Sequence, residues 1–102
     1  MGTNHGADPS RVVDRADFGQ ELTLLRQQAG LTVRALAARV GLPSATAGGY
    51  FGARHLPSPN RVATLCALLA GCGVTEPEDV EAWLDALARA RRVSDGRLHR
   101  GR

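Results

Sequence analysis

The sequence contains no lysine and no isoleucine, and it has few cysteines and aromatic residues. All 13 basic residues are arginine, which we attribute to GC-rich coding rather than to mechanism. The two cysteines, Cys66 and Cys72, have no second CxxC pair, and the three histidines are scattered over both tails and a loop. A zinc site needs about four ligands of these types close together. We therefore predict no metal and no cofactor, with both thiols as small buried hydrophobes in a reducing compartment.

Long apolar runs are also absent, since stretches such as residues 67–70 are too short to cross a bilayer. The first residues, MGTNHGADPS, lack the basic stretch and apolar stretch of a secretory signal. The length of 102 residues, with 43% hydrophobic and 23% charged residues, is typical of one folded globular domain. We expect a small cytoplasmic domain without a membrane partner.

Alternation of apolar and polar residues, the signature of a strand, does not persist anywhere in the chain. Apolar residues instead recur at helical spacing. Helix-capping residues open the predicted helices at Asp17, Thr32, Ser58 and Thr75, and Gly41 ends the second. The predicted fold is all-α, with five helices over about 17–29, 32–40, 44–51, 58–70 and 75–92.

This pattern divides the chain into a flexible N-terminal arm over 1–16, a helical domain over 17–92 and a basic, Arg-rich C-terminal tail over 93–102. The net charge of +3 hides an uneven distribution. Residues 18–75 carry five Arg and one Glu (+4), residues 76–88 carry five acids and no base (−5), and residues 89–102 carry six Arg and one Asp (+5). Such a distribution suits a polyanionic partner, although solubility alone explains it equally well.

Residues 32–51 have the spacing of two short helices that cross steeply. Ala37 is small enough for the helices to touch, and Gly41 tolerates the positive φ of a tight turn. Ala47 and Tyr50 are placed to pack the second helix onto the first. The segment therefore predicts a helix-turn-helix.

The stretch LLRQQAGLTVRALAARVGLPSATAGGYFGARHLPSP, with the following helix ending in LAGCGV, resembles the Xre/lambda-repressor-like family of bacterial and phage DNA-binding domains. The resemblance covers roughly residues 22–74 and implies a five-helix lambda-repressor-like domain that binds double-stranded DNA. Within it, GGYFxxRHLPxP also looks like small domains at the N-termini of large bacterial signalling ATPases.

The resemblance implies two groups of DNA-binding residues. The third helix would face the major groove through Ser44, Ala45, Gly48 and Gly49, with Thr46 alongside. Phosphates would be contacted by Arg34, Arg54, His55, Asn60 and Arg61. Affinity should then depend strongly on salt and only modestly on sequence, and a chain of this size would need a homodimer or a further domain.

The sequence departs from the family at three places. No Arg, Lys, Asn or Gln lies on the groove face of the third helix, so that helix offers no bidentate base contact. Val33 replaces a Gln that touches a phosphate in many relatives. Ala53 stands where a Gly normally follows the third helix, with Gly52 one place early.

Two hypotheses remain open on this evidence. One is a DNA-binding transcriptional regulator, and the other is a protein-interaction domain that keeps the fold without recognising DNA. Arg34, Arg39 and Arg61 are each explained equally well as solvated surface charge. Trp83 is expected in the core, between the fifth helix and the first; an exposed Trp83 would instead mark a partner surface. We expect no enzyme, because paired carboxylates, an activated nucleophile and a phosphate-binding loop are all missing from the sequence.

Overall fold

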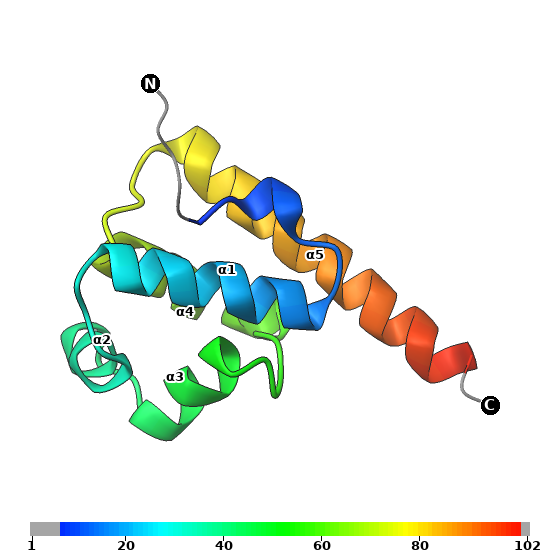
Figure 1. Cartoon of the computed structure of the whole chain (residues 1–102), viewed down its shortest axis with the longest axis horizontal. Coiled ribbons are helices and arrows are strands. Elements are labelled where there is room, and N and C mark those ends of the chain that lie inside the picture. Colours follow the sequence, from blue (N-terminus) through cyan, green and yellow to red (C-terminus); the bar gives the residue numbers. More distant parts are fainter. Residues whose placement is uncertain (1–6, 101–102) are drawn as a thin grey trace.

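The computed structural model describes residues 7–100, apart from the side chains of residues 59 and 94–100. Within that range the chain is helical and contains no strand, which confirms the all-α prediction. The elements in chain order are η1 (Pro9–Arg11), α1 (Arg15–Gln28), α2 (Val33–Val40), α3 (Ser44–Phe51), η2 (Pro59–Arg61), α4 (Val62–Gly71) and α5 (Pro77–Arg100) (Figure 1).

The hydrophobic core lies around α1, which packs against α5 on one side and against α3 on the other (Figure 1). Helix α2 packs against α3 and α4. Phe18 of α1 and Trp83 of α5 are buried and meet edge to face, with ring centroids 6.0 Å apart. Trp83 is therefore a core residue, as predicted, and holds α5 on α1.

The described part of the predicted arm is packed against the domain. The Arg89 guanidinium donates from Nε to the Val12 carbonyl oxygen at 2.9 Å and from Nη2 to that of Pro9 at 2.7 Å. Val12 is 1% exposed, and the Asp8 amide donates to Oε1 of Glu21 at 3.0 Å. Residues 7–16 thus do not form the flexible arm expected from composition, and residues 1–6 lie outside the described range.

Three helix ends differ from the sequence prediction. Helix α4 begins at Val62, after η2, and Ser58 makes no side-chain capping bond. Helix α1 begins at Arg15, because Asp14 accepts a hydrogen bond from the Asp17 amide and Asp17 accepts one from the Val13 amide. Helix α5 continues through the predicted tail to Arg100. No proline interrupts that stretch, and its single glycine costs a helix only about 1 kcal/mol. Residues 101–102 of the predicted tail lie outside the described range.

The two cysteines are free and half-buried rather than fully buried. Burial raises the pKa of the Cys72 thiol. None of the helices, over the residues described, is long and apolar enough to cross a membrane.

Candidate nucleic-acid interface

The turn between α2 and α3 has the chemistry that the sequence predicted. The Thr32 side chain caps α2 by accepting a hydrogen bond from the Ala35 amide at 3.0 Å. Gly41 adopts the left-handed conformation (φ 72°, ψ 38°), and the next amide, that of Leu42, donates to the Ala37 carbonyl oxygen at 2.9 Å. These bonds end α2 and direct the chain into α3.

Helix α3 is fixed on the domain by one face. Ala47, Tyr50 and Phe51 are buried, and the Thr23 hydroxyl donates to the Phe51 carbonyl oxygen at 3.1 Å. The Arg26 guanidinium lies over the Phe51 ring, 5.2 Å from its centroid. The opposite face of α3 is left to solvent.

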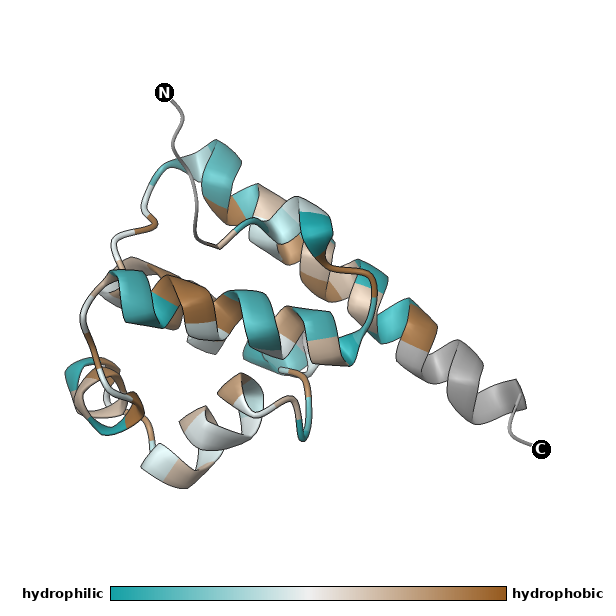
Figure 2. Ribbon diagram, in the orientation of Figure 1, coloured by the Kyte–Doolittle hydropathy of each residue, from teal (hydrophilic) through white to brown (hydrophobic). Residues whose placement is uncertain are grey.

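That solvent face carries little side-chain bulk. Ser44 and Ala45 are exposed, and Thr46 and Gly48 are half-buried. In Figure 2, α3 has nearly neutral hydropathy along most of its length, in contrast to the hydrophilic start of α5. Four of the five residues predicted to face the groove are thus at least partly accessible. Gly49, the fifth, is buried.

The chain folds back along α3 immediately after the helix ends. The Arg54 amide donates to the Gly49 carbonyl oxygen at 2.9 Å, and the Ala53 amide donates to that of Tyr50 at 3.2 Å. This is a Schellman turn, whose left-handed position is usually glycine. Here that position is Ala53, with φ 62°, a conformation that costs a residue with a side chain about 1–2 kcal/mol.

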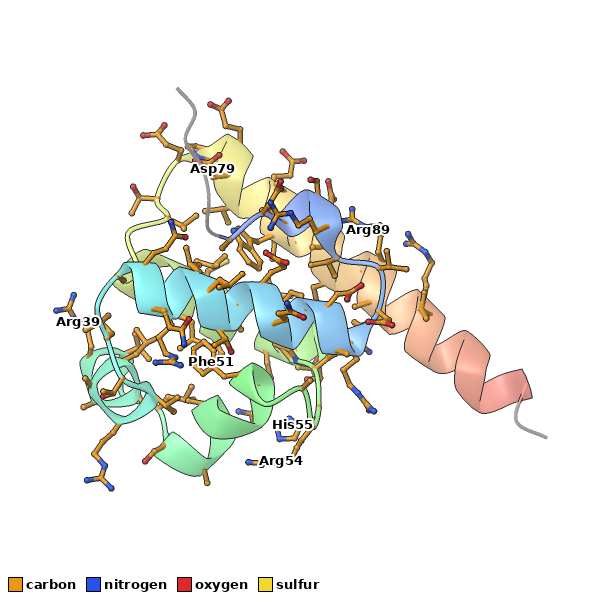
Figure 3. All side chains as sticks on the ribbon, viewed as in Figure 1. Arg39, Phe51, Arg54, His55, Asp79 and Arg89 are labelled. Carbon is orange, nitrogen blue, oxygen red and sulfur yellow. The ribbon has the colours of Figure 1, made fainter. Side chains whose placement is uncertain are left out.

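The turn places Arg54 and His55 against α3, and Gly49 makes room for His55 (Figure 3). A β-carbon at Gly48 would lie 3.8 Å from Nη2 of Arg54, and one at Gly52 would lie 3.8 Å from Nη1. A β-carbon at Gly49 would overlap the His55 imidazole. Gly49 is therefore covered by His55 and is not itself part of the solvent face, contrary to the sequence prediction.

His55 also forms one wall of a small polar pocket. Its ring meets the Tyr50 ring edge to face, with centroids 5.3 Å apart. The pocket has a volume of about 300 Å³ and is lined by Thr46, Tyr50, His55, Leu56, Ser58 and Arg61. Three residues predicted separately from the sequence, Thr46, His55 and Arg61, are thus brought together. Asn60, beside Arg61 in η2, is exposed.

Three arginine side chains around α3 have no partner among the described residues. Arg34 of α2, Arg54 and Arg61 are exposed, and their side chains make no hydrogen bond or ion pair with the described part of the protein. The exposed acids of α5 begin at Glu78, and Figure 3 places Asp79 on the opposite side of the molecule from Arg54 and His55. Positive charge therefore gathers on the α2–α3 side. The described residues contain no group of three His, Cys, Asp or Glu suited to a metal ion.

The sequence model of a family described as a helix-turn-helix domain matches residues 17–83, which include most of α1, all of α2 to α4 and the start of α5. No curated protein and no solved structure matches the chain significantly.

Proposed function

The chain belongs to the helix-turn-helix domain family, and from that premise we propose that it binds double-stranded DNA through its α2–α3 side. We further propose that it is a small transcriptional regulator of the Xre/lambda-repressor-like type, acting in the bacterial cytoplasm and without a catalytic step. Helix α3 would enter the major groove, which is wide enough for an α-helix.

The observation that carries the proposal is the set of unpartnered arginines around α3. Arg34 lies on α2, Arg61 on η2, and Arg54 on the turn between α3 and η2. Guanidinium groups without an internal acceptor keep all their donors for the phosphate oxygens and base edges of a duplex. Asp79, in the acidic first turn of α5, lies on the far side of the domain, so the field on the α2–α3 side attracts a polyanion.

The small side chains of α3 favour close approach to the bases. Ser44 can donate to or accept from a base edge, and the Ala45 methyl can contact a thymine methyl. Arg34, Asn60 and Arg61 would lie toward the phosphates at the two edges of the groove. Because one domain of this size makes few such contacts, we propose that a homodimer or a further domain adds affinity.

The same small side chains support a second candidate function. A helix whose exposed residues are Ser44 and Ala45 can also pack against an apolar surface. The chain would then be a protein-interaction domain of a larger bacterial signalling or defence protein, with its arginines as solvated surface charge.

Binding to a fluorescent duplex of random sequence, measured by anisotropy at about 50 and 200 mM salt, distinguishes the two functions. If three or four phosphates are contacted, affinity should fall about 40- to 150-fold between these salts. The matched control is Arg92→Ala, which removes an exposed arginine beside Val13, away from α3. It should leave affinity unchanged. No binding at the lower salt would refute the DNA-binding proposal and favour a protein partner.

A further inference from the structure

Base-specific recognition by this domain needs a side chain that α3 itself does not provide. The exposed residues of α3 are Ser44 and Ala45, and neither carries the two fixed polar groups that a bidentate contact with one base edge needs. Thr46 is half-buried beside the His55 pocket. Any strong preference for one base pair at the middle of the interface must therefore come from a residue outside α3 whose side chain packs against this helix.

The Arg54 side chain packs against α3 in this way. We call the site of its guanidinium the glycine notch, formed by Gly48 and Gly52. Both terminal nitrogens lie 3.8 Å from the positions that β-carbons of these glycines would occupy, one nitrogen against each. That distance is ordinary van der Waals contact, so the guanidinium lies directly beside both positions. The notch thus supports the flat side chain along the solvent face of α3.

The backbone fixes the direction of Arg54. The Arg54 amide is bonded to the Gly49 carbonyl oxygen at 2.9 Å, and Ala53 holds the left-handed conformation that reverses the chain. His55 covers Gly49, so the next position along α3 is already occupied. The Arg54 side chain is exposed and has no acceptor among the described residues, so its donors are available.

From this geometry we propose that Arg54, supported by the glycine notch, recognises the guanine of a G·C pair in the major groove. The inference rests on the proposed function and deepens it. A guanidinium matches guanine O6 and N7 with two parallel hydrogen bonds, and this pairing is the commonest specific contact in the major groove. Arg34 and Arg61, on the elements that flank α3, contact phosphates and carry no sequence information.

Selection of bound duplexes from a randomised pool tests the role of Arg54. The wild-type chain should enrich sites with a fixed G·C pair, and replacing that pair by A·T should weaken binding roughly 5- to 150-fold. In Arg54→Ala the same replacement should change the affinity by less than about twofold. Arg34→Ala should weaken binding to every duplex while keeping the full preference for G·C.

Two further measurements separate base recognition from charge. Arg54→Lys keeps the charge but lacks the planar fork, so it should keep most of the affinity and lose most of the G·C preference. Replacing that guanine by 7-deazaguanine removes the N7 acceptor, which should weaken wild-type binding and leave Arg54→Ala unaffected. The urea midpoint of each variant should match that of the wild type, which shows that the fold is intact.

Two results would overturn the inference while leaving DNA binding in place. One is a pool with no fixed G·C pair, and the other is an Arg54→Ala chain that is weaker on all duplexes but keeps the G·C preference. The second result would make Arg54 a phosphate contact. Failure of the wild-type chain to bind any duplex would refute the proposed function together with this inference.

Discussion

Two arginines on one side of this domain and three on the other have opposite uses. On the side formed by η1, α1 and α5, Arg89 donates to two main-chain carbonyl oxygens of the η1 segment and Arg11 lies 3.8 Å from the Glu21 carboxylate. On the α2–α3 side, Arg34, Arg54 and Arg61 are exposed and, among the described residues, have no partner.

The helices on the two sides also differ in how well their local sequence stabilises them. Helix α1 begins with a side-chain cap from Asp14, whereas α3 begins after Pro43 without one. Two of the eight residues of α3 are glycine, and an alanine in the left-handed conformation follows it. Arg89 and Asp14 on one side therefore stabilise the fold, whereas the three arginines around α3 are free and lie beside a helix of low intrinsic stability. The partner of an arginine, more than its position in the sequence, indicates its role.

The largest effect that separates the two sides is expected for Arg89→Ala. The substitution removes two hydrogen bonds from a charged donor and leaves the Pro9 and Val12 carbonyl oxygens without that partner. The free energy of unfolding should fall by about 2–3 kcal/mol, which corresponds to roughly 8–24 °C in melting temperature. Urea and thermal unfolding measure this change. DNA affinity at a temperature where the variant is folded should be unchanged, and a large loss of affinity would contradict the division of roles.

A smaller effect, of opposite sign, is expected at the glycines of α3. Gly48→Ala should raise the free energy of unfolding by about 1 kcal/mol, because alanine favours helix and its β-carbon meets Arg54 at an ordinary contact distance. Gly49→Ala should raise the free energy of unfolding much less, because its β-carbon displaces the His55 ring from Tyr50. Adding His55→Ala to Gly49→Ala should recover the gain in urea unfolding. Equal stabilisation by the two single variants would show that His55 does not cover Gly49.

For Arg34→Ala the effect on stability should be within about 0.5 kcal/mol, as for most exposed residues. The dissociation constant for a random duplex should rise several-fold, and the slope of log K against log salt should become shallower by about 0.9. Anisotropy titrations over a salt series measure both quantities. Arg39→Ala is the matched control on the same helix, because Figure 3 places Arg39 away from Arg54 and His55. An equal effect of Arg39→Ala would indicate general charge attraction instead.

The smallest effect concerns Asp8, whose carboxylate accepts hydrogen bonds from the Ser10 hydroxyl at 2.7 Å and the Ser10 amide at 3.0 Å. These bonds hold the pKa of Asp8 below its ordinary value of 3.8. A depressed pKa stabilises the folded state above pH 3.8, and that contribution is lost as the pH falls through the folded pKa.

Asp8→Asn keeps an acceptor oxygen but does not titrate. The difference in unfolding free energy between wild type and Asp8→Asn should therefore be constant near neutral pH and should shrink below pH 3.8. Urea unfolding at a series of pH values measures it. A difference that stays constant through the acid range would show that the carboxylate has no role in holding η1.

Local sequence signals predicted the elements that depend on local chemistry. The spacing of Thr32, Ala37 and Gly41 predicted α2 and its turn, and α3 has the bounds expected for it. The packing of Trp83 on α1 followed from its position in a helical stripe. Caps, turns and amphipathic faces involve residues a few positions apart, so they are visible in the sequence.

The parts that sequence could not predict depend on distant partners or on an unusual backbone. The η1 segment is held by Arg89, whose partner Val12 lies 77 residues away in the chain. The placement of Arg54 depends on Ala53 adopting a conformation that alanine rarely adopts. The sequence identified Arg54 and His55 as binding residues but predicted a groove face of α3 without large polar side chains. It gave no sign that these two residues fold back over Gly48 and Gly49.

The weak local preferences of α3 have a consequence for its dynamics. With two glycines and no side-chain cap, α3 needs little free energy to open locally while the core around α1 stays folded. Its amide hydrogens should therefore exchange with solvent faster than those of α1. A bound duplex would shift this equilibrium toward the closed helix, so part of the binding free energy would be spent on ordering α3. DNA should therefore slow amide exchange most over residues 44–51.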